Sequence, residues 1–268
     1  MLQSYFFTNP YRENDKVTQW FAKHIRDPLT DDPRVIFATV CFRWFTWIPT
    51  GIALMNYVHP TERFNTAGAH LGLLTKWNLV DCMKLLMDRQ DKGLQIFTGA
   101  FNISNSGSTD PKIHRVCRDY ITPVWDARSD LIPDLESCKT LEQMHKVLMK
   151  FPGLGGSGFM AYEIVCDLMH TSYFESVSGA DSWANPGPGA KRGLNRVLER
   201  PIDAPVSKGV YLTESRQIML EVNRKLRAVK YPLADMRTIE HSLCEFDKYE
   251  RARLNDGHMK RRYNGGKS

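Results

Sequence analysis

The chain has 268 residues, of which 42% are hydrophobic and 25% are charged, and its formal net charge is +6 at pH 7 with an isoelectric point near 9.0. This length fits one large domain or two small ones. No apolar run reaches the roughly 18 residues of a membrane helix, and the first residues lack the basic-then-apolar pattern of a signal peptide. We therefore expect a cytoplasmic protein that has no membrane partner and whose mild positive charge suits a polyanion.

The six cysteines are scattered and form no C-x-x-C pair, which argues against a zinc site, an iron–sulfur cluster and a disulfide scaffold. We expect free and mostly buried thiols. The eight histidines show no metal-ligand spacing, so we predict no protein metal site. The chain also lacks the G-x-x-x-x-G-K-[ST] signature of P-loop kinases and the G-x-S-x-G elbow of serine hydrolases.

The first motif is FTNPYREND at residues 7–15. Pro10 favours an extended backbone before it, and a helical pattern starts at Glu13. Asn9, Arg12 and Asp15 fall in the turn that leads into this helix. They either cap the helix and pair with one another or belong to a functional site, and the residues alone leave both alternatives open.

Residues 33–47 form the next predicted helix, which is apolar on nearly every side and should be buried at the centre of the fold. Arg43 stands alone inside it. A buried guanidinium must be paired because its desolvation costs several kcal/mol. The partner could be a structural carboxylate, which is the more common outcome, or a bound phosphate.

Further helices are predicted at 61–73, 76–91 and 111–125, with Pro123 ending or kinking the last of them. No group of alternating strands is present, so the sequence predicts an all-α fold. We expect a single domain over residues 1–268, built of two helical lobes.

A glycine hairpin, FPGLGGSG at residues 151–158, separates two further predicted helices. Thr140 and Gln143 form a capping box that opens the first helix, which ends at Lys150, and the second helix covers 157–169. Glycine permits positive φ and close approach, so the hairpin N–H groups could hold a DNA phosphate. The predicted contacts with the DNA backbone are Gly153, Gly155, Gly156 and Ser157. An ordinary helix C-cap is the alternative.

Asp181 follows the second helix of this pair and could act as a general base, stabilise a developing cation or simply cap a helix. The segment GPGAKRGLN at residues 187–195 is a rigid loop that feeds a short basic helix. Its Lys191 and Arg192 could hold a phosphate or pyrophosphate, or could form an ordinary solvated face. Thr213 is predicted to cap the helix that follows.

The last predicted helix, 236–254, has two faces. Ile239, Leu243 and Phe246 form an apolar side. The opposite, polar side, which amphipathicity alone would also explain, carries His241, Cys244, Glu245 and Lys248, with Arg251 at its edge. A basic and flexible tail at about 256–268 is expected to touch nucleic acid.

Several of these motifs resemble one known family. Residues 7–15, GPGAKRGLN at 187–195 and IEHSLCEFDKY at 239–249 resemble segments of the helical domain attached to 5-hydroxymethyluracil DNA kinases and of the related alpha-glutamyl/putrescinyl thymine pyrophosphorylases. The hairpin followed by Asp181 resembles the helix-hairpin-helix and aspartate of the DNA glycosylase superfamily. The resemblance implies a glycosylase-like helical fold with a helix-hairpin-helix at about 141–170.

The resemblance also implies an activity in the thymidine hypermodification of bacterial viruses. There a kinase pyrophosphorylates 5-hydroxymethyluracil in DNA, and a glycosylase-like enzyme replaces the pyrophosphate with an amine. The missing P-loop favours the second, transferase step. Its partners would be double-stranded DNA that carries a modified thymidine, flipped out of the duplex, and an amino acid or polyamine. A base-excision glycosylase and a non-catalytic DNA-binding partner of a kinase are the alternatives.

Site roles follow from the resemblance by position. The catalytic candidates are Asp181, at the catalytic position of the superfamily, together with Glu245, His241 and Lys248. Binding of substrate and pyrophosphate is expected at Asn9, Arg12, Lys191, Arg192, Asn195 and Arg251. Arg43 is added to this group because a buried guanidinium could pair with a phosphate. No cofactor is predicted, although a Mg²⁺ ion accompanying the pyrophosphate is left open.

Overall fold

The computed structural model describes residues 5, 7–59, 71–99, 103 and 109–254. These residues contain helices and no β-strand, so the predicted all-α fold is confirmed. The chain divides into two compact units, which we call the terminal unit (residues 1–15 and 179–268) and the middle unit (residues 16–178). Within the described ranges, no helix is both long and apolar enough to cross a membrane.

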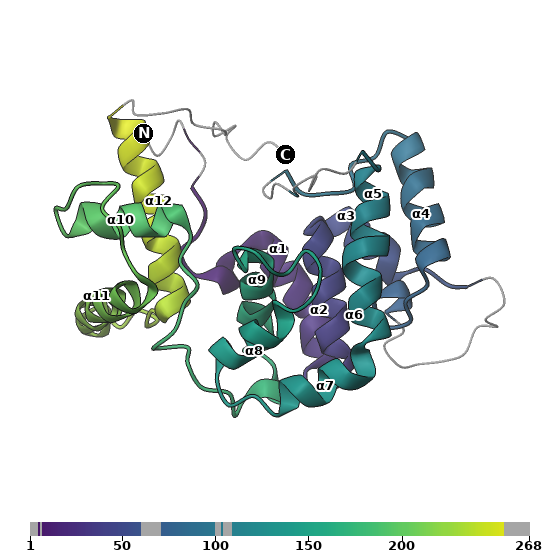
Figure 1. Cartoon of the computed structure of the whole chain (residues 1–268), viewed down its shortest axis with the longest axis horizontal. Coiled ribbons are helices and arrows are strands. Elements are labelled where there is room, and N and C mark those ends of the chain that lie inside the picture. Colours follow the sequence, from purple (N-terminus) through teal and green to yellow (C-terminus); the bar gives the residue numbers. More distant parts are fainter. Residues whose placement is uncertain (1–4, 6, 60–70, 100–102, 104–108, 255–268) are drawn as a thin grey trace. The chain divides into compact units, whose positions relative to one another are not determined.

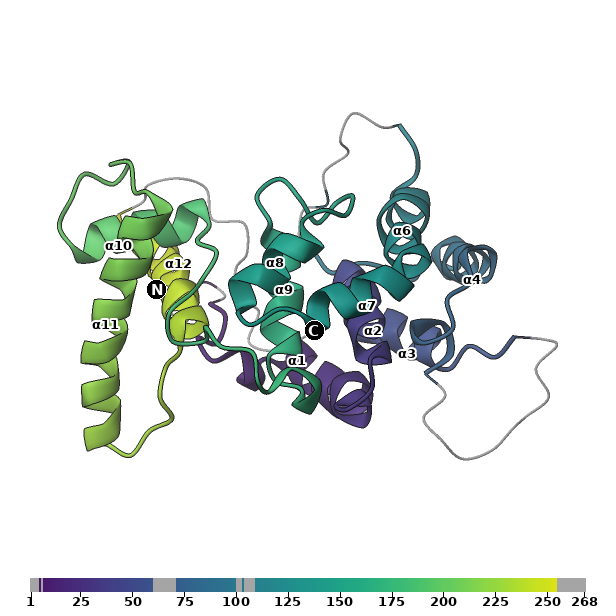
Figure 2. The same ribbon diagram turned by 60° about the horizontal axis from the view of Figure 1, so that its bottom comes forward.

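The middle unit contains the helices α1 to α9 (Figures 1 and 2). Short 3-10 and π-helical turns connect several of them. The α-helices are α1 (Lys16–Phe21), α2 (Arg34–Phe45), α3 (Ile48–Met55), α4 (Leu79–Asp91), α5 (Lys112–His114), α6 (Thr122–Asp126), α7 (Arg128–Glu136), α8 (Leu141–Leu148) and α9 (Phe159–Leu168).

Helix α2 forms the core of the middle unit, as its all-round apolar sequence predicts. Every residue from Val35 to Phe45 is buried, and α2 contacts α3 and α9. Phe42 packs between two aromatic rings, with its centroid 5.2 Å from that of Phe21 and 5.4 Å from that of Trp20. Burial on all sides means that any polar side chain of this helix must find its partner inside the unit.

One helix of the middle unit differs from the sequence prediction. The helix expected at 111–125 consists of α5, a π-helical stretch (Arg115–Ile121) and α6. Pro123 lies in the first turn of α6, where its missing N–H costs no hydrogen bond. The helix expected at 61–73 and the tail at 256–268 fall mostly or wholly outside the described residues.

The terminal unit contains α10 (Pro188–Val197), α11 (Lys208–Ala228) and α12 (Met236–Arg253), which contact one another (Figure 2). A 3-10 turn, Arg12–Asn14, belongs to the same unit. The prediction that Thr213 caps α11 is wrong. Ser207 is the cap, since its Oγ accepts a hydrogen bond from the Val210 N–H, and α11 begins five residues before Thr213.

Helices α10 and α12 approach so closely that two glycines are required in the segment 187–195. A Cβ atom at Gly193 would lie 1.9 Å from the Leu243 carbonyl oxygen, and one at Gly189 would lie 2.7 Å from the Cys244 Sγ. These glycines are one helical turn apart and face the same neighbour. Close packing of two helices therefore accounts for this part of the motif, in addition to any role in binding phosphate.

The buried face of α12 also differs from its prediction. Phe246 was expected on the apolar side, but 36% of its surface is exposed, whereas Asp247 is completely buried. Ile239 and Leu243 are buried, as predicted. The face that packs against α10 thus includes a carboxylate, and this carboxylate organises a cluster of arginines described below.

Candidate active site

The N-terminal segment packs on α12 through Thr8. Its N–H donates to Glu245 Oε2 at 3.1 Å, and its Oγ1 lies 2.7 Å from His241 Nε2. His241 and Glu245 are one helical turn apart, so both face the same segment. Two predicted catalytic residues are therefore brought together and fixed by a residue more than 230 positions away in the sequence.

Lys248 completes this group on α12. Its Nζ donates to Glu245 Oε2 at 3.1 Å and lies 5.0 Å from the centroid of the Phe7 ring. The side chains of Lys248 and Glu245 are 24% and 18% exposed, respectively. An ammonium, a carboxylate and an imidazole thus share one partly buried face, where charge interactions are stronger than at an open surface.

The rest of the N-terminal motif stabilises this arrangement. The Tyr11 hydroxyl donates to the Pro232 carbonyl oxygen at 2.7 Å, and the Tyr11 and Tyr231 rings are 5.7 Å apart. Burial, followed by nearby Tyr231 and Asp235, raises the pKa of Tyr11. The Asn9 Oδ1 accepts a hydrogen bond from the Tyr11 N–H at 3.0 Å, which is a local turn contact, and Arg12 begins the following 3-10 turn. The 3-10 turn has no side-chain cap, so Asn9 does not cap a helix here, and its role as a site residue stays a prediction.

Asp181 lies in an exposed turn of the terminal unit. The preceding Ala180 carbonyl oxygen accepts a hydrogen bond of 2.8 Å from the N–H of Met236, the first residue of α12. The Asp181 carboxylate makes no hydrogen bond or ion pair with the described residues and is open to solvent. Within the terminal unit, Asp181 is therefore placed beside the beginning of α12.

A cluster of three arginines surrounds Asp247, whose side chain is 0% exposed. Arg192 Nε and Nη2 lie 3.0 and 2.9 Å from Asp247 Oδ2, and Arg196 Nε lies 3.0 Å from Oδ1. Arg251 Nε is 3.3 Å from Oδ2. We call Asp247, Arg192, Arg196 and Arg251 the arginine cluster. Of these, Arg192 and Arg251 were predicted to bind pyrophosphate.

Thr8, Arg196 and Asp247 were not predicted as site residues. Two spacing signals could have identified the arginine cluster. Arg192 and Arg196 are four residues apart on the short basic helix, as are Asp247 and Arg251 on the last one, and residues at this spacing share a helix face. Nothing local could have linked Thr8 to α12, because that contact depends on the tertiary fold.

Two residues near the arginine cluster have structural partners. The Asn195 side chain is buried, and its Nδ2 donates to the carbonyl oxygens of Ile202 and Ala204 at 2.9 and 3.0 Å. It therefore fixes the loop after α10, which we had not predicted. Burial, followed by Glu240, Glu245 and Asp247, raises the pKa of Cys244 to about 11, so its thiol stays protonated at neutral pH.

The glycine hairpin of the middle unit joins α8 to α9. The predicted capping box of Thr140 and Gln143 is present at the start of α8. Gly153, Gly156 and Gly158 have φ angles of 75°, 66° and 67°, which other residues rarely adopt. Gly156 and Ser157 are exposed, so this part of the hairpin is accessible to a ligand.

The four hairpin residues predicted to contact DNA differ in their surroundings. A Cβ atom at Gly153 would lie 2.8 Å from the Trp44 and Tyr120 rings, so this glycine is needed for packing. Gly156 has open space around it, and the N–H groups of Gly155 and Gly156 have no backbone partner in the described part of the chain. The available donors thus lie at the tip of the hairpin.

Arg43 has the structural partner that was one of its two predicted alternatives. Its Nη2 donates to Asp167 Oδ1 at 2.7 Å, and its Nε donates to Asp167 Oδ2. The side chains are 2% and 0% exposed, and the guanidinium lies 5.3 Å from the centroid of the Phe21 ring. Its pairing donors are therefore directed to a carboxylate in the core of the middle unit, and we remove Arg43 from the predicted pyrophosphate-binding residues.

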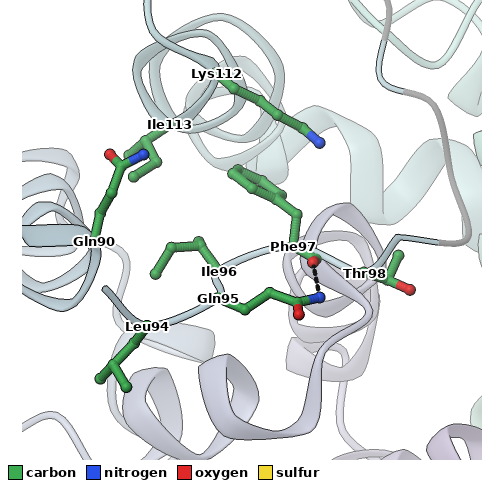
Figure 3. A pocket seen from close by; sticks show the side chains of 8 residues that line it. All are labelled: Gln90, Leu94, Gln95, Ile96, Phe97, Thr98, Lys112 and Ile113. Atoms are coloured by element: carbon green, nitrogen blue, oxygen red, sulfur yellow. Dashed lines mark hydrogen bonds between the residues drawn. The ribbon is translucent and has the colours of Figure 1, made fainter. Parts of the chain in front are cut away.

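The middle unit also has two surface hollows that none of the predicted site residues lines. One, of about 300 Å³, contains Lys112 Nζ at 4.3 Å from the centroid of the Phe97 ring (Figure 3). Burial, followed by nearby Arg115, lowers the pKa of Lys112. The other, of about 410 Å³, lies beside Trp125 and Arg128. Gln90 and Gln95, which line the first hollow, are exposed. The described residues do not indicate which kind of ligand either hollow would bind.

The chemistry available to the described residues is that of charged and hydrogen-bonding side chains. Within the described ranges, no group of three or more His, Cys, Asp and Glu residues is placed to hold a metal ion. The six cysteines are free, and all but Cys244 are buried, which agrees with the prediction of mostly buried thiols. The terminal unit therefore offers a carboxylate, an imidazole and an ammonium group on α12 beside Thr8. It also offers a cluster of guanidinium groups that come from both α10 and α12.

Comparison with known proteins gives two matches. Residues 1–259 match the family described as the 5-hmdU DNA kinase, helical domain. A 5-hmdU DNA kinase of Bacillus phage SP10 is 24% identical over 275 residues, an alignment that covers 93% of this chain and 40% of the relative. The chain thus spans about two fifths of the length of that kinase. No solved structure gives a significant match.

Proposed function

We propose, because the chain belongs to the family of 5-hmdU DNA kinase helical domains, that it takes part in thymidine hypermodification of DNA. More specifically, it replaces the pyrophosphate of 5-pyrophosphoryloxymethyluracil in DNA with the amine of an amino acid or polyamine. The chain has no P-loop signature of its own, which favours a step after phosphorylation.

The observation that carries this proposal is the group formed by His241, Glu245 and Lys248 beside Thr8. Amine transfer needs a group that binds a cationic amine and a group that accepts its proton. A carboxylate next to an imidazole provides both. The positive charge of Lys248 and of the nearby arginines suits an anionic leaving group.

The reaction balances without a redox partner. The bond between the methylene carbon and the pyrophosphate oxygen breaks, and its electron pair leaves with the pyrophosphate. Electron release from the pyrimidine ring assists this step. The lone pair of the amine then forms the new C–N bond, and the proton lost by the amine passes to Glu245 or His241. Lys191, Arg192 and Arg251 neutralise the departing pyrophosphate.

Asp181 contributes from the other end of α12. It lies beside Met236, and Asp247 is eleven residues further along the helix, or about 16 Å at the usual rise per residue. A carboxylate at this distance from the arginine cluster acts on the incoming amine or on the reacting base and not on the leaving group. We therefore assign to Asp181 the first proton of the incoming ammonium, which is lost before the attack, whereas Glu245 or His241 takes the second proton when the C–N bond forms.

The glycine hairpin of the middle unit serves to hold DNA. Its exposed tip offers the N–H groups of Gly155 and Gly156, which suit a backbone phosphate and do not read sequence. The methylene carbon of a modified thymine becomes accessible when the base leaves the stack, so the substrate is a flipped nucleotide in duplex DNA. A helical DNA glycosylase-like fold is suited to this task.

A second candidate function is a non-catalytic one. The chain covers only 40% of the kinase from Bacillus phage SP10, so the matching segment of that protein is one part of a longer enzyme. A helical module of this kind could present DNA to a separate kinase. It would bind DNA without changing it, whereas a base-excision glycosylase would release free base.

One assay separates these functions. Duplex DNA with 5-pyrophosphoryloxymethyluracil is incubated with the chain and a mixture of glycine, glutamate, lysine and putrescine, and the nucleosides are then analysed by mass spectrometry. An amine adduct with released pyrophosphate supports the transferase. Free base supports a glycosylase, and DNA binding without product supports the non-catalytic module.

The variant Glu245→Gln tests the group that carries the proposal. It keeps the size of the side chain and removes the charge that binds Lys248. We expect adduct formation to fall by about a hundredfold, the usual order for a lost general base. The control is Glu221→Gln, an exposed residue of α11 that pairs with Arg224. Equal activity of both variants would remove Glu245 from the mechanism.

A further inference from the structure

The arginine cluster has a surplus of positive charge around one buried carboxylate. Arg192, Arg196 and Arg251 contribute three positive charges and Asp247 one negative charge, so the net charge is +2. The nearest further carboxylate along α12, Glu250, is already paired with Arg253 by two hydrogen bonds of 2.9 and 2.6 Å. Glu250 and Arg253 together add no net charge, so the cluster keeps its surplus, although Arg196 also acts on Glu250 as a weaker partner than Arg253.

The cluster also has more N–H donors than Asp247 can accept. One carboxylate has two acceptor oxygens, whereas each guanidinium carries a full fork of donors. Arg196 shows the consequence most clearly, since its side chain is only 8% exposed and its Nη2 is buried without a hydrogen-bond partner in the described structure. A buried unsatisfied donor costs free energy unless a ligand supplies an acceptor.

Asp247 holds these guanidinium groups in a fixed relation to one another. It is completely buried and bonds arginines from both α10 and α12. The side chains of Arg192 and Arg251 remain 31% and 32% exposed, so their outer donors can reach a ligand in solution. The close approach of the two helices, which depends on Gly193, sets the spacing of the arginines.

We infer that the arginine cluster is a phosphate-binding site. Arg196, which was not predicted from the sequence, is one of its ligands, and Asp247 is a positioning residue. The ligand class is a phosphate or pyrophosphate dianion, which matches a +2 site of guanidinium forks. This inference deepens the proposed function and depends on it for one source of the ligand, the leaving pyrophosphate. A backbone phosphate of DNA is the other source.

Two titrations of the whole chain distinguish these sources. Inorganic pyrophosphate is titrated by calorimetry, and an unmodified DNA duplex is titrated by fluorescence anisotropy at several salt concentrations. The variants are Arg192→Ala, Arg251→Ala and the double variant, in which the partly exposed arginines are removed. Arg224→Ala is the control, because this exposed arginine of α11 pairs with Glu221 outside the cluster.

For a pyrophosphate site, each single variant weakens pyrophosphate binding about tenfold and the double variant about a hundredfold, while Arg224→Ala stays within twofold of the parent chain. For a backbone-phosphate site, DNA binding weakens instead, and its salt slope falls by about one for each arginine removed. Either result supports the inference. If both titrations of the double variant match those of Arg224→Ala, the cluster is not a phosphate site.

Asp247→Asn tests the positioning role by the sign of its effect. A purely electrostatic view predicts tighter pyrophosphate binding because a negative charge is lost. Fixed arginine geometry predicts weaker binding, by about tenfold, in a variant whose circular dichroism shows the parent helix content. Tighter binding would overturn the role given to Asp247. Should this variant not fold, Arg196→Lys tests the geometry instead, because it keeps the charge and removes the fork, and parent-like binding would overturn the inference.

These measurements are independent of the transfer reaction. If no amine adduct forms but the arginine variants lose pyrophosphate or DNA binding, the site stands and the proposed function fails. If adducts form and both titrations are unchanged, the proposed function stands and the arginine cluster has another role.

Discussion

Thr8 and Glu245 are 237 positions apart in the chain, yet the backbone N–H of one donates to the carboxylate of the other at 3.1 Å. The same threonine contacts His241 through its hydroxyl at 2.7 Å. Among replacements of Thr8, only proline removes this backbone donor, so the contact with the Glu245 carboxylate does not depend on the threonine side chain. The two motifs that resemble the same family therefore form one structural element of the terminal unit.

Replacing Asp181 tests its proposed catalytic role, because the substitution should not change the stability of the chain. It is exposed and makes no side-chain hydrogen bond or ion pair with the described residues, so Asp181→Asn should leave the melting temperature within about 1 °C of the parent chain. If it deprotonates the amine, adduct formation falls about a hundredfold. Asp203→Asn, an exposed aspartate of the same unit, is the control. Parent-like adduct formation in Asp181→Asn would contradict the assignment.

The hairpin in the middle unit is tested by adding a negative charge at its tip. Ser157 is exposed beside the available N–H groups, so Ser157→Glu should repel a DNA phosphate and weaken duplex binding by about five- to tenfold at low salt. Ser129→Glu adds the same charge at an exposed position of α7. Anisotropy measurements in which the two variants bind DNA equally would argue against the hairpin as a DNA contact.

Two glycine substitutions should change the stability of the chain in opposite directions. Gly193 lies at the contact between α10 and α12, whereas Gly209 lies in open space. Gly193→Ala places a Cβ atom 1.9 Å from a backbone oxygen of α12 and should destabilise the chain by about 1–3 kcal/mol. Gly209→Ala, in α11, meets nothing within 4 Å and should stabilise the chain by about 0.5–1 kcal/mol. Urea unfolding measures both changes, and a Gly193→Ala variant as stable as the parent would refute the close approach of the helices.

Cys244 makes stability depend on pH in the alkaline range. Burial raises its pKa from 9.0 to about 11, so the unfolded chain releases the thiol proton at lower pH than the folded chain. The contribution is fully present below about pH 9 and is lost as pH rises to about 11, by up to about 3 kcal/mol.

The measurement for Cys244 is the difference between the parent chain and Cys244→Ala. Other groups of raised pKa, such as Tyr211 and Cys41, also lose stability at high pH, and the difference removes their common contribution. We expect the free energies of unfolding to converge between pH 9 and pH 11. A constant difference over this range would show that the thiol does not titrate as inferred.

Breaking the buried pair of Arg43 and Asp167 should lower the stability of the chain and leave ligand binding unchanged. Asp167→Ala leaves a buried guanidinium unpaired and should cost about 3–5 kcal/mol in the free energy of unfolding. Asp88→Ala removes an exposed pair with Lys92 and should cost less than about 1 kcal/mol. Folded Asp167→Ala that binds pyrophosphate like the parent supports the structural role. A selective loss of pyrophosphate binding would instead support Arg43 as a pyrophosphate-binding residue.

The local features of this protein follow from its amino-acid order alone. Apolar periodicity predicted the buried helix α2 and the last helix α12, and the capping box of Thr140 fixed the start of α8, because these signals depend on neighbours in the chain. Motif order also pointed to the family that the comparison confirms. It did not predict the cap of α11, since Ser207 and Thr213 are both good caps and only packing selects between them.

Which charged residues act together depends on how the helices pack in three dimensions. From the sequence, Asp247 is an ordinary polar residue of an amphipathic helix. It is buried because the glycines of α10 allow that helix to pack closely against α12. The sequence left Arg43 with two possible partners, a structural carboxylate as the more common outcome or a phosphate, and the structure shows Asp167 beside it. Pairing of buried charges is settled by desolvation and three-dimensional distance, which the order of residues along a chain does not contain.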